Sequence, residues 1–246
     1  MRYIISDIHG CYHEYMELLN KIKFSDKDEL YILGDAVDRG PEPIKVLKDI
    51  MNRRNAVFII GNHDFIMYTL MRKLAVEITA ENVDNYLVAD DILDYNLWMQ
   101  DGGQVTAEQF RALSKEEKAD ILEFLSEALL YETIVYGGKR FILVHAGLAN
   151  FSPDKDLDDY DLYDFLEEWA DYSKRYYPDE NTYLVTGHTP TIYIDGWRKA
   201  EVYNKNGHIA IDCCCVESGK LAAYCIETEE VTYVGGRNFI LMNGTG

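Results

Sequence analysis

Short runs of apolar residues, each followed by a polar or glycine-containing turn, recur along the chain. Runs of this length, bounded by turn residues, are typical of β-strands. They lie at residues 3–5, 30–33, 57–60, 141–144, 183–185, 209–211, 221–226 and 231–234. Between the first three runs, apolar residues recur at helical spacing, over residues 15–22 and, after Pro41, over residues 44–51. This alternation predicts βαβ units with parallel strands.

The remaining pattern divides into a helical part and a strand-rich end. From residue 65 to about 130 the sequence is mostly helical in pattern and is interrupted at Gly102-Gly103, and we expect this insert to form a cap beside the functional site. The last three runs have short connections, which predicts antiparallel pairing at the end of a mixed sheet. No repeat or flexible linker divides the chain, so we expect a single domain over residues 1–246.

Side chains that can bind a metal ion follow five of the predicted strands. The five turns are Ser6-Asp7-Ile8-His9-Gly10, Gly34-Asp35-Ala36-Val37-Asp38-Arg39-Gly40, Gly61-Asn62-His63-Asp64, His145-Ala146-Gly147 and Thr186-Gly187-His188-Thr189-Pro190. In each turn a carboxylate, carboxamide or imidazole stands near a glycine. Ligands of open α/β sheets gather outside the carboxyl ends of the strands. If these strands are neighbours, the five turns converge on one site.

The donor types in these turns indicate which ion the site would hold. Two Asp, three His and one Asn offer mixed oxygen and nitrogen ligands, which suit Mn²⁺, Fe, Zn or Ni better than Ca²⁺ or Mg²⁺. Six ligands exceed what one catalytic metal uses, because positions must stay open for water and substrate. Two divalent metal ions roughly 3.5–4 Å apart, bridged by one carboxylate, would use all six. Asp35 is central in order and is the expected bridge.

Charge and composition narrow the class of partner. The net charge is −19 and no cluster of Lys and Arg is present, which predicts no nucleic-acid partner. No apolar run reaches the ~18 residues that span a bilayer, so we expect no membrane association. The first residues become acidic too early for a signal peptide, which predicts a cytoplasmic protein. Residues 154–171 hold nine carboxylates and one lysine, and we interpret them as a solvated loop and helix face in preference to a docking surface for basic peptides.

The five cysteines predict free thiols in a reducing compartment. Cys213-Cys214-Cys215 lies in an alternating apolar stretch that we interpret as a strand. Alternation would place the first and third thiols on one face and the second on the other. Three consecutive strand residues cannot converge on one ion, so we expect buried side chains there and no zinc site.

The five turns resemble the signatures of the phosphoprotein phosphatase family within the calcineurin-like metallophosphoesterases. Those signatures run Asp-x-His-Gly, Gly-Asp-x-Val-Asp-Arg-Gly, Gly-Asn-His-Glu/Asp, His-x-Gly and Gly-His-Thr-Pro. Residues 98–106 resemble that family's Trp-containing Asn-Gly-Gly segment, and Ile211-Asp212 resembles its late Ile-Asp-Thr-Gly. The resemblance covers nearly the whole chain. It implies a four-layer α/β/β/α sandwich with mixed sheets and a helical insert.

The resemblance also implies a role for each residue of the turns. One metal would be held by Asp7, His9 and Asp35, and the other by Asp35, Asn62, His145 and His188. His63 resembles the histidine that protonates the leaving oxygen, Asp38 resembles its carboxylate partner, and Arg39 resembles the arginine that grips the phosphate. Substrate would thus contact Arg39, Asn62 and His63. The implied mechanism is in-line attack on phosphorus by a metal-bound hydroxide, with manganese as the favoured metal.

Three positions depart from the protein-phosphatase pattern. Ile60 stands where relatives usually have Arg before Gly-Asn-His, and Leu166 stands where a second phosphate-binding Arg often lies. Asp64 replaces the more common Glu. Two absent guanidinium groups would weaken phosphate binding unless Lys174 or Arg175 supplies a substitute.

These departures leave three hypotheses for the function. The first is a Ser/Thr protein phosphatase-like enzyme acting on a phosphorylated protein or a small phosphoester. It is favoured by Asp38 and by the net charge of −19, which would attract a basic phosphopeptide. The alternative is a diadenosine tetraphosphate hydrolase, which shares the metal motifs and typically has an apolar residue before Gly-Asn-His-Asp. The third, a catalytically inactive phosphate-binding scaffold, is disfavoured because such a scaffold needs no general acid.

Overall fold

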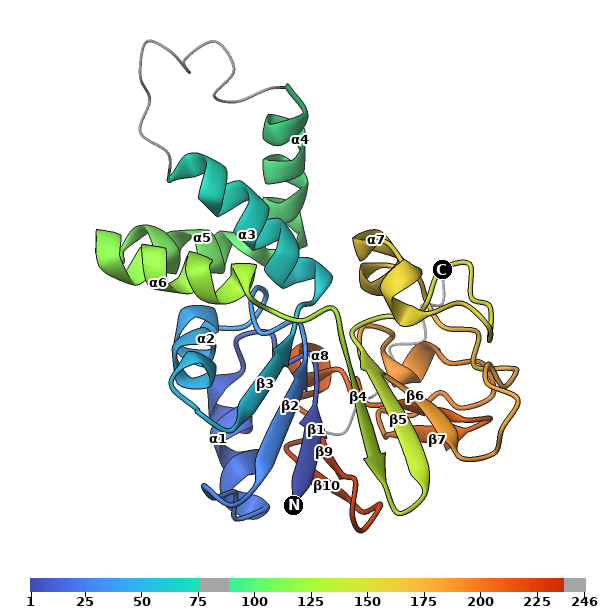
Figure 1. Ribbon diagram of the computed structural model, residues 1–246. Coiled ribbons are helices and arrows are strands. Elements are labelled where there is room, and N and C mark those ends of the chain that lie inside the picture. Colours follow the sequence, from blue (N-terminus) through green and yellow to red (C-terminus); the bar gives the residue numbers. More distant parts are fainter. Residues whose placement is uncertain (76–88, 237–246) are drawn as a thin grey trace, which may run out of the picture.

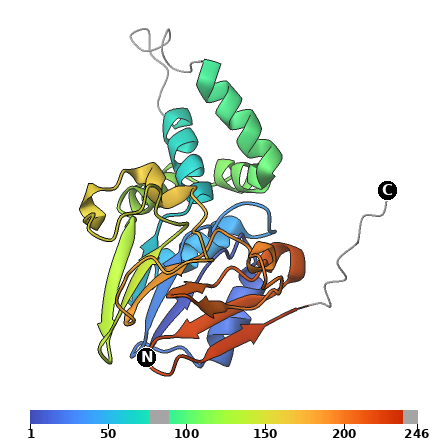
Figure 2. The ribbon, with the colours of Figure 1, turned by 90° about the vertical axis from the view of Figure 1, so that its right-hand side faces the viewer.

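Two five-stranded sheets lie face to face in the computed structural model (Figures 1 and 2). The structure describes residues 1–75 and 89–236. Apolar side chains from both sheets meet in the layer between them, among them Ile4, Leu33, Phe141, Leu143 and Tyr224. The four-layer sandwich predicted from the sequence is therefore confirmed.

The first sheet has the strand order β10-β9-β1-β2-β3. Strands β1 (Arg2–Ile5), β2 (Glu29–Leu33) and β3 (Ala56–Ile59) are parallel and are joined by helices α1 (Tyr12–Lys21) and α2 (Pro43–Met51). This confirms the predicted βαβ units. Strands β9 (Leu221–Cys225) and β10 (Val231–Val234) pair antiparallel beside β1. The helices cover the outer face of this sheet, where they bury a large apolar cluster.

The second sheet has the order β4-β5-β6-β8-β7. It contains β4 (Tyr131–Tyr136), β5 (Lys139–Val144), β6 (Thr182–Thr186), β7 (Tyr203–Lys205) and β8 (His208–Ala210). The sequence prediction missed β4 and β7, although β4 is rich in β-branched and aromatic residues and Gly137-Gly138 forms its hairpin turn at φ 59° and 79°. It also placed the strand near residue 209 with the last two strands. That placement is wrong, because β8 pairs with β6 and β7 in this sheet.

The outer face of the second sheet is covered mostly by loops and short helices. These helices are η3 (Leu157–Asp159), α7 (Leu162–Leu166) and η4 (Thr191–Tyr193). Their buried apolar residues include Leu157, Phe165 and Ile194. Of the nine carboxylates in residues 154–171, all but Asp164 are exposed, which agrees with a solvated segment.

The insert that connects β3 of the first sheet to β4 of the second is helical where the structure describes it. It rises above the first sheet in Figure 1. It comprises α3 (Asn62–Leu74), α4 (Ala89–Trp98), the π-helical turn η2 (Met99–Gly103), α5 (Gln104–Arg111) and α6 (Lys115–Ser126). Residues 76–88 of the predicted cap lie outside the described residues. Gly102 has φ 98°, a conformation that favours glycine, and it separates α4 from α5 as the sequence indicated.

The chain around the three consecutive cysteines is not a strand, which corrects the sequence prediction. Cys214 has φ 62°, and a short helix, α8 (Cys215–Ser218), follows it. The Asp212 carboxylate accepts a hydrogen bond from the Cys214 N–H at 2.8 Å, which turns the chain at this point. All five cysteines are buried free thiols, as expected. Within the described residues, no helix has the length and apolar character needed to cross a membrane.

Candidate active site

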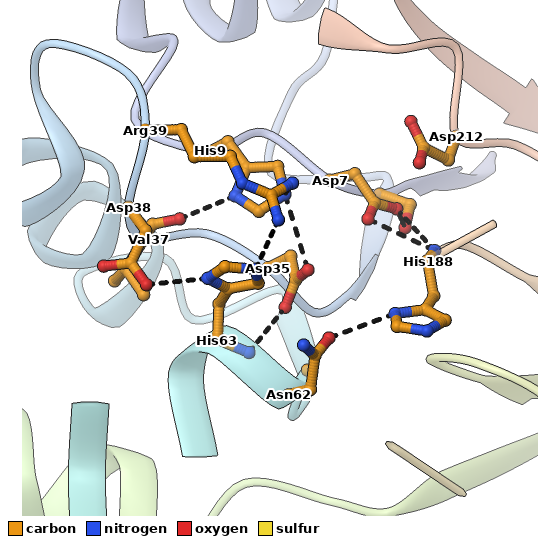
Figure 3. A network of polar contacts seen from close by, with 12 residues as sticks. Asp7, His9, Asp35, Val37, Asp38, Arg39, Asn62, His63, His188 and Asp212 are labelled. Carbon is orange, nitrogen blue, oxygen red and sulfur yellow. Dashed lines mark hydrogen bonds and ion pairs between the residues drawn. The ribbon is translucent and has the colours of Figure 1, made fainter. Parts of the chain in front are cut away.

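The five predicted turns meet at one end of the sandwich, although their strands belong to two different sheets. His145, after β5, places Nδ1 2.7 Å from the carbonyl oxygen of Leu33 at the end of β2. The backbone N–H of His188, after β6, donates to the carboxylate of Asp7 at 3.0 Å. The predicted convergence therefore occurs across the interface between the sheets (Figure 3).

The backbone of the turns is strained where the functional side chains emerge. Six of these residues have positive φ, namely Asp7, His9, Asp35, Asp38, Arg39 and His188, with values between 43° and 69°. Such conformations cost roughly 1–3 kcal/mol for a residue with a side chain, and they cluster at functional sites. Glycine is needed where the turns approach most closely. A Cβ on Gly61 would lie 2.2 Å from Asp35 Oδ1.

Asp35 lies between histidines from the two sheets. Its Oδ2 is 3.4 Å from His9 Nε2, and its Oδ1 is 3.5 Å from His145 Nε2. Burial alone would raise the pKa of Asp35, but the neighbouring His145, His63 and His9 lower it below its usual value. An ionised carboxylate with one oxygen on each side has the arrangement expected of a bridging ligand.

The predicted histidine ligands are oriented through one ring nitrogen. His9 Nδ1 lies 2.8 Å from the carbonyl oxygen of Val37, and His145 Nδ1 makes the contact with Leu33 described above. Each contact leaves Nε2 available to a metal. Burial lowers the pKa of His9 to about 3 and, together with His145, the pKa of His188 to about 4. These rings are therefore neutral at pH 7, which is the form that binds metal.

The donor atoms form two groups that share one carboxylate. Among the described residues, the sets whose donor atoms all lie within 4.8 Å of one another are His9, Asp35, His63 and Asp35, His145, His188. Asn62 Oδ1 adjoins the second set, at 2.9 Å from His145 Nε2 and 3.1 Å from His188 Nδ1. The first set contains His63 where the resemblance implied Asp7. The Asp7 carboxylate accepts hydrogen bonds from Ser6 and from the backbone of His188 instead.

Another buried carboxylate, Asp212, lies near Asp7 in Figure 3. Burial, followed by the charges of Asp212 and Asp35, raises the pKa of Asp7. Burial, with the charges of Glu217 and Asp35, raises the pKa of Asp212 to about 7. Carboxylates buried this close oppose one another's ionisation, and nearby divalent cations would relieve that opposition. The donor set therefore fits metal ions. The sequence named Asp212 only through its resemblance and gave it no role.

Asp38 orients His63 from a fully buried position. The Asp38 Oδ2 atom lies 2.7 Å from His63 Nδ1 and accepts a 2.7 Å hydrogen bond from Trp98 Nε1. Asp38 Oδ1 accepts a 2.6 Å hydrogen bond from Thr106 Oγ1. Burial opposes a charge on His63, but Asp35 and Asp38 raise its pKa above the usual value. The sequence missed this function of the helical insert, although Trp98 and Thr106 bound the segment that carries the resemblance.

Arg39 contacts both histidines of the first donor group. Its guanidinium nitrogens lie 3.1 Å from His9 Nε2 and 2.7 Å from His63 Nε2. Asp101, from the turn between α4 and α5, accepts a hydrogen bond from Arg39 Nη2 at 3.2 Å and lies 3.5 Å from His63 Nε2. The next residue, Gly102, accepts a hydrogen bond from the Arg39 backbone N–H at 3.0 Å. An exposed carboxylate thus faces the arginine expected to bind phosphate.

The positions that depart from the protein-phosphatase pattern have structural roles. Ile60 and Leu166 are 5% and 1% exposed, so both lie in the apolar interior. Asp64 accepts hydrogen bonds from the backbone N–H groups of Asp35 and Ala36, at 2.7 and 3.0 Å, and holds the turn after β2.

The two candidate substitutes for the absent arginines bind elsewhere. Lys174 pairs with Asp171 at 2.9 Å, and Arg175 donates to the carbonyl oxygens of Asp179 and Thr182. In the described part of the chain, Arg39 alone brings a guanidinium into hydrogen bonds with the side chains of the site.

Comparison with known sequences shows the family to which this chain belongs. The model of the calcineurin-like phosphoesterase family matches residues 3–219. The chain is 28% identical over 249 residues to the asymmetrical bis(5'-nucleosyl)-tetraphosphatase PrpE of Geobacillus sp. (strain WCH70), covering 90% of this chain and 88% of that one. It is 35% identical over 100 residues to the symmetrical bis(5'-nucleosyl)-tetraphosphatase of Erwinia tasmaniensis. That second match spans 40% of this chain and 36% of the relative's length.

Solved structures share the fold at low sequence identity. A crystal structure named as a candidate diadenosine tetraphosphatase superposes with a TM-score of 0.61 and 22% identity, covering 96% of this chain and 94% of that one. A protein serine/threonine phosphatase from Saccharomyces cerevisiae superposes with a TM-score of 0.54 and 12% identity, covering 96% and 80%. At these identities the likeness shows the fold alone.

Proposed function

The chain belongs to the calcineurin-like phosphoesterase family, and we propose that it hydrolyses dinucleoside polyphosphates such as diadenosine tetraphosphate with two divalent metal ions. The observation that carries this proposal is that, among the described residues, only Arg39 brings a guanidinium to the site, while Ile60 and Leu166 are buried apolar residues. A phosphomonoester presents a dianionic terminal phosphate, whereas each internal phosphate of a dinucleoside polyphosphate carries one negative charge. One arginine matches the smaller charge better.

The names of the relatives support the same substrate class. Those that match most of the chain and those that match part of it are both bis(5'-nucleosyl)-tetraphosphatases. Hydrolysis of dinucleoside polyphosphates is therefore a better supported hypothesis than protein phosphatase activity. The apolar Ile60 before Gly61-Asn62-His63-Asp64 favours it too.

The proposed metal ligands form two sets that share Asp35. One ion would be held by Asp7, His9 and Asp35, and the other by Asp35, Asn62, His145 and His188. Bound there, two divalent ions would act as Lewis acids on the phosphoryl oxygens and lower the pKa of a bound water. The mixed oxygen and nitrogen donors favour manganese, with iron, zinc or nickel as alternatives.

The remaining residues would act on the phosphate and the leaving group. His63 would give its proton to the leaving phosphate oxygen, held in position by Asp38. Arg39 would bind the phosphate that is attacked, and it would leave its present contact with His63 Nε2 to do so. The Arg39 side chain is a third exposed, so it has room to make this movement. Its backbone stays fixed, because its N–H donates to the Gly102 carbonyl.

Hydrolysis of phosphoserine or phosphothreonine proteins is the second candidate function. The acidic segment at residues 154–171 favours it, because this segment packs against a ligand-bearing turn through the hydrogen bond from Ala146 N–H to the Phe165 carbonyl, at 3.0 Å. Exposed carboxylates there would attract a basic phosphopeptide.

One comparison of rates tests the proposed function. We would measure kcat/KM with Mn²⁺ on diadenosine tetraphosphate and on phosphoserine, phosphothreonine and phosphotyrosine peptides. We expect diadenosine tetraphosphate to be preferred at least about tenfold, a difference of ~1.4 kcal/mol in transition-state binding, and a chelator to abolish turnover. A preference for phosphopeptides would support the second candidate instead. No turnover of any of these substrates would indicate the inactive scaffold.

A further inference from the structure

Two large aromatic side chains lie exposed and nearly parallel on the second-sheet side of the site. Trp169 is 51% exposed and Tyr193 is 62% exposed. Their ring centroids are 6.5 Å apart and their planes differ by 15°. Leaving so much aromatic surface in water forgoes hydrophobic stabilisation that burial would provide. Paired exposed rings of this kind are better explained by a ligand than by the needs of the fold.

Both rings are carried by segments that hold the metal-binding turns. Trp169 lies two residues after Glu167, whose backbone is near enough to the His188 ring to act on the pKa of that imidazole, opposing the lowering by burial. The same segment packs closely on the turn after β5, where a Cβ on Gly147 would lie 2.4 Å from the Glu168 carbonyl oxygen. The rings are therefore tied to both histidine-bearing turns of the second sheet.

Tyr193 is anchored from the other side of the same turn. It ends η4, which begins three residues after His188. Thr191 ties this helix to Asp212 by two hydrogen bonds to its carbonyl oxygen, both 2.9 Å. The Tyr193 N–H donates to the Pro190 carbonyl at 2.8 Å. The backbone that carries the ring is therefore held in place before any ligand arrives, which reduces the entropy lost on binding.

We propose that Trp169 and Tyr193 form a platform on which a nucleobase of the substrate stacks while its phosphates lie at the metal site. This inference rests on the proposed function and names the part of the site that recognises the nucleoside. Aromatic side chains bind bases through their π-faces with little dependence on sequence. The two ring planes differ by only 15°, so both can present nearly parallel faces to the same base.

The negative charge beside the rings favours binding of a nucleobase there over binding of a phosphate. Glu167 and Glu168, just before Trp169, are exposed carboxylates. They would repel a phosphate group at this position, whereas they can accept hydrogen bonds from the amino group of an adenine. The platform therefore takes the nucleobase, and the phosphates extend from it toward His188 and Asp35.

The experiment compares substrates with and without bases. For Trp169→Ala, we expect KM for diadenosine tetraphosphate to rise about 5- to 150-fold, the range found when a stacking partner of a base is removed. KM for inorganic tetraphosphate, which has the same phosphates and no base, should stay within about twofold. Trp169→Phe keeps a flat ring and should restore most of the affinity. Tyr136→Ala removes an exposed ring on β4 and serves as the matched control.

A binding measurement separates this inference from the proposed function. Calorimetric titration with AMP in the presence of chelator should give a Kd at least about fivefold higher for Trp169→Ala and Tyr193→Ala than for the wild type and for Tyr136→Ala. Equal AMP affinity in all four proteins would overturn the platform. An equal rise of KM for both tetraphosphates would also overturn it, because the segment would then only support His145 and His188. Absence of diadenosine tetraphosphate hydrolysis in the wild type, with AMP binding lost in Trp169→Ala, would instead reject the proposed reaction and keep the platform.

Discussion

The two sides of the site differ in what lies beside their buried histidines, and we call the first-sheet side enclosed and the second-sheet side open. On the first-sheet side, Asp38 is fully buried and its carboxylate contacts Trp98, Thr106 and His63. On the second-sheet side, His145 and His188 adjoin a loop layer that exposes Trp169 and other large or charged side chains. Under the proposed function, the enclosed side would serve proton transfer, which needs fixed geometry and low dielectric. The open side would serve recognition, which needs an accessible surface.

The enclosed side depends on a part of the chain that lies far from it in sequence. Trp98 and Thr106 are separated from Asp38 by 60 and 68 residues, and they bracket the turn that places Asp101 beside Arg39. The helical insert therefore completes the hydrogen bonding of Asp38, the partner of the proposed general acid His63, and is more than a cover over the site. We predict that substitutions on this side change kcat, whereas those on the open side change KM.

Removal of the shared carboxylate should have the largest effect, because it damages both sides at once. Asp35→Asn should lose both metal ions and nearly all activity, whereas His9→Asn should keep about one ion per chain, since His9 adjoins only one donor group. Metal content of the purified variants, measured after passage through a chelating resin, checks this. Equal residual metal in the two variants would contradict the bridging role.

Substitution of His63 should affect the enclosed side alone. His63→Asn should retain both metal ions and lower kcat roughly 10²- to 10⁴-fold for substrates whose leaving group needs a proton. With p-nitrophenyl phosphate the loss should be much smaller, because that leaving group departs as a stable anion. The ratio of the two kcat values is the measurement. An equal loss on both substrates would show that His63 is not the general acid.

Removal of one hydrogen bond in the insert should lower kcat by a smaller factor. Trp98→Phe keeps a ring against Gly103 and removes the Nε1–H that donates to Asp38. A hydrogen bond to a charged group contributes about 1.5–3 kcal/mol, so we expect kcat to fall about 10-fold or more while KM and metal content stay unchanged.

The matched control for this change is Trp197→Phe, which removes an indole N–H that donates to the Glu201 carbonyl at 3.0 Å. That variant should leave kcat unaltered. A rise in KM without a fall in kcat for Trp98→Phe would mean that the insert acts in recognition, and the contrast between the two sides would fail.

The smallest expected effect concerns the exposed carboxylate beside Arg39. Asp101 is 64% exposed, and an exposed ion pair is worth about 0–1 kcal/mol. Asp101→Asn should therefore strengthen inhibition by inorganic phosphate up to about fivefold, because Arg39 no longer pairs with an anion of the protein. Asp171→Asn, which breaks the pair with Lys174, is the control for a change of net charge. Unchanged inhibition constants would show that Asp101 does not compete with phosphate.

Local patterns in the sequence were enough to predict the candidate ligand residues and half of the scaffold. Each ligand-bearing turn directly follows a strand, and such strand-to-turn patterns depend on residues that are neighbours in the chain. Parallel strands β1 to β3, their two helices and the interruption at Gly102 were predicted for the same reason. The β-branched and aromatic residues of β4, followed by Gly137-Gly138, were a signal for the hairpin with β5 that the prediction overlooked.

The arrangement of these strands, helices and turns depends on tertiary contacts, which the local patterns did not predict. The tertiary structure placed β8 in the second sheet, directed Lys174 and Arg175 away from the site, and brought Trp98 and Thr106 to Asp38. It also buried Leu166, so an arginine there would have to enter an apolar interior. Each of these outcomes depends on packing between segments far apart in the chain, where many pairings satisfy the same local preferences. The choice among them follows from burying the apolar faces of both sheets together.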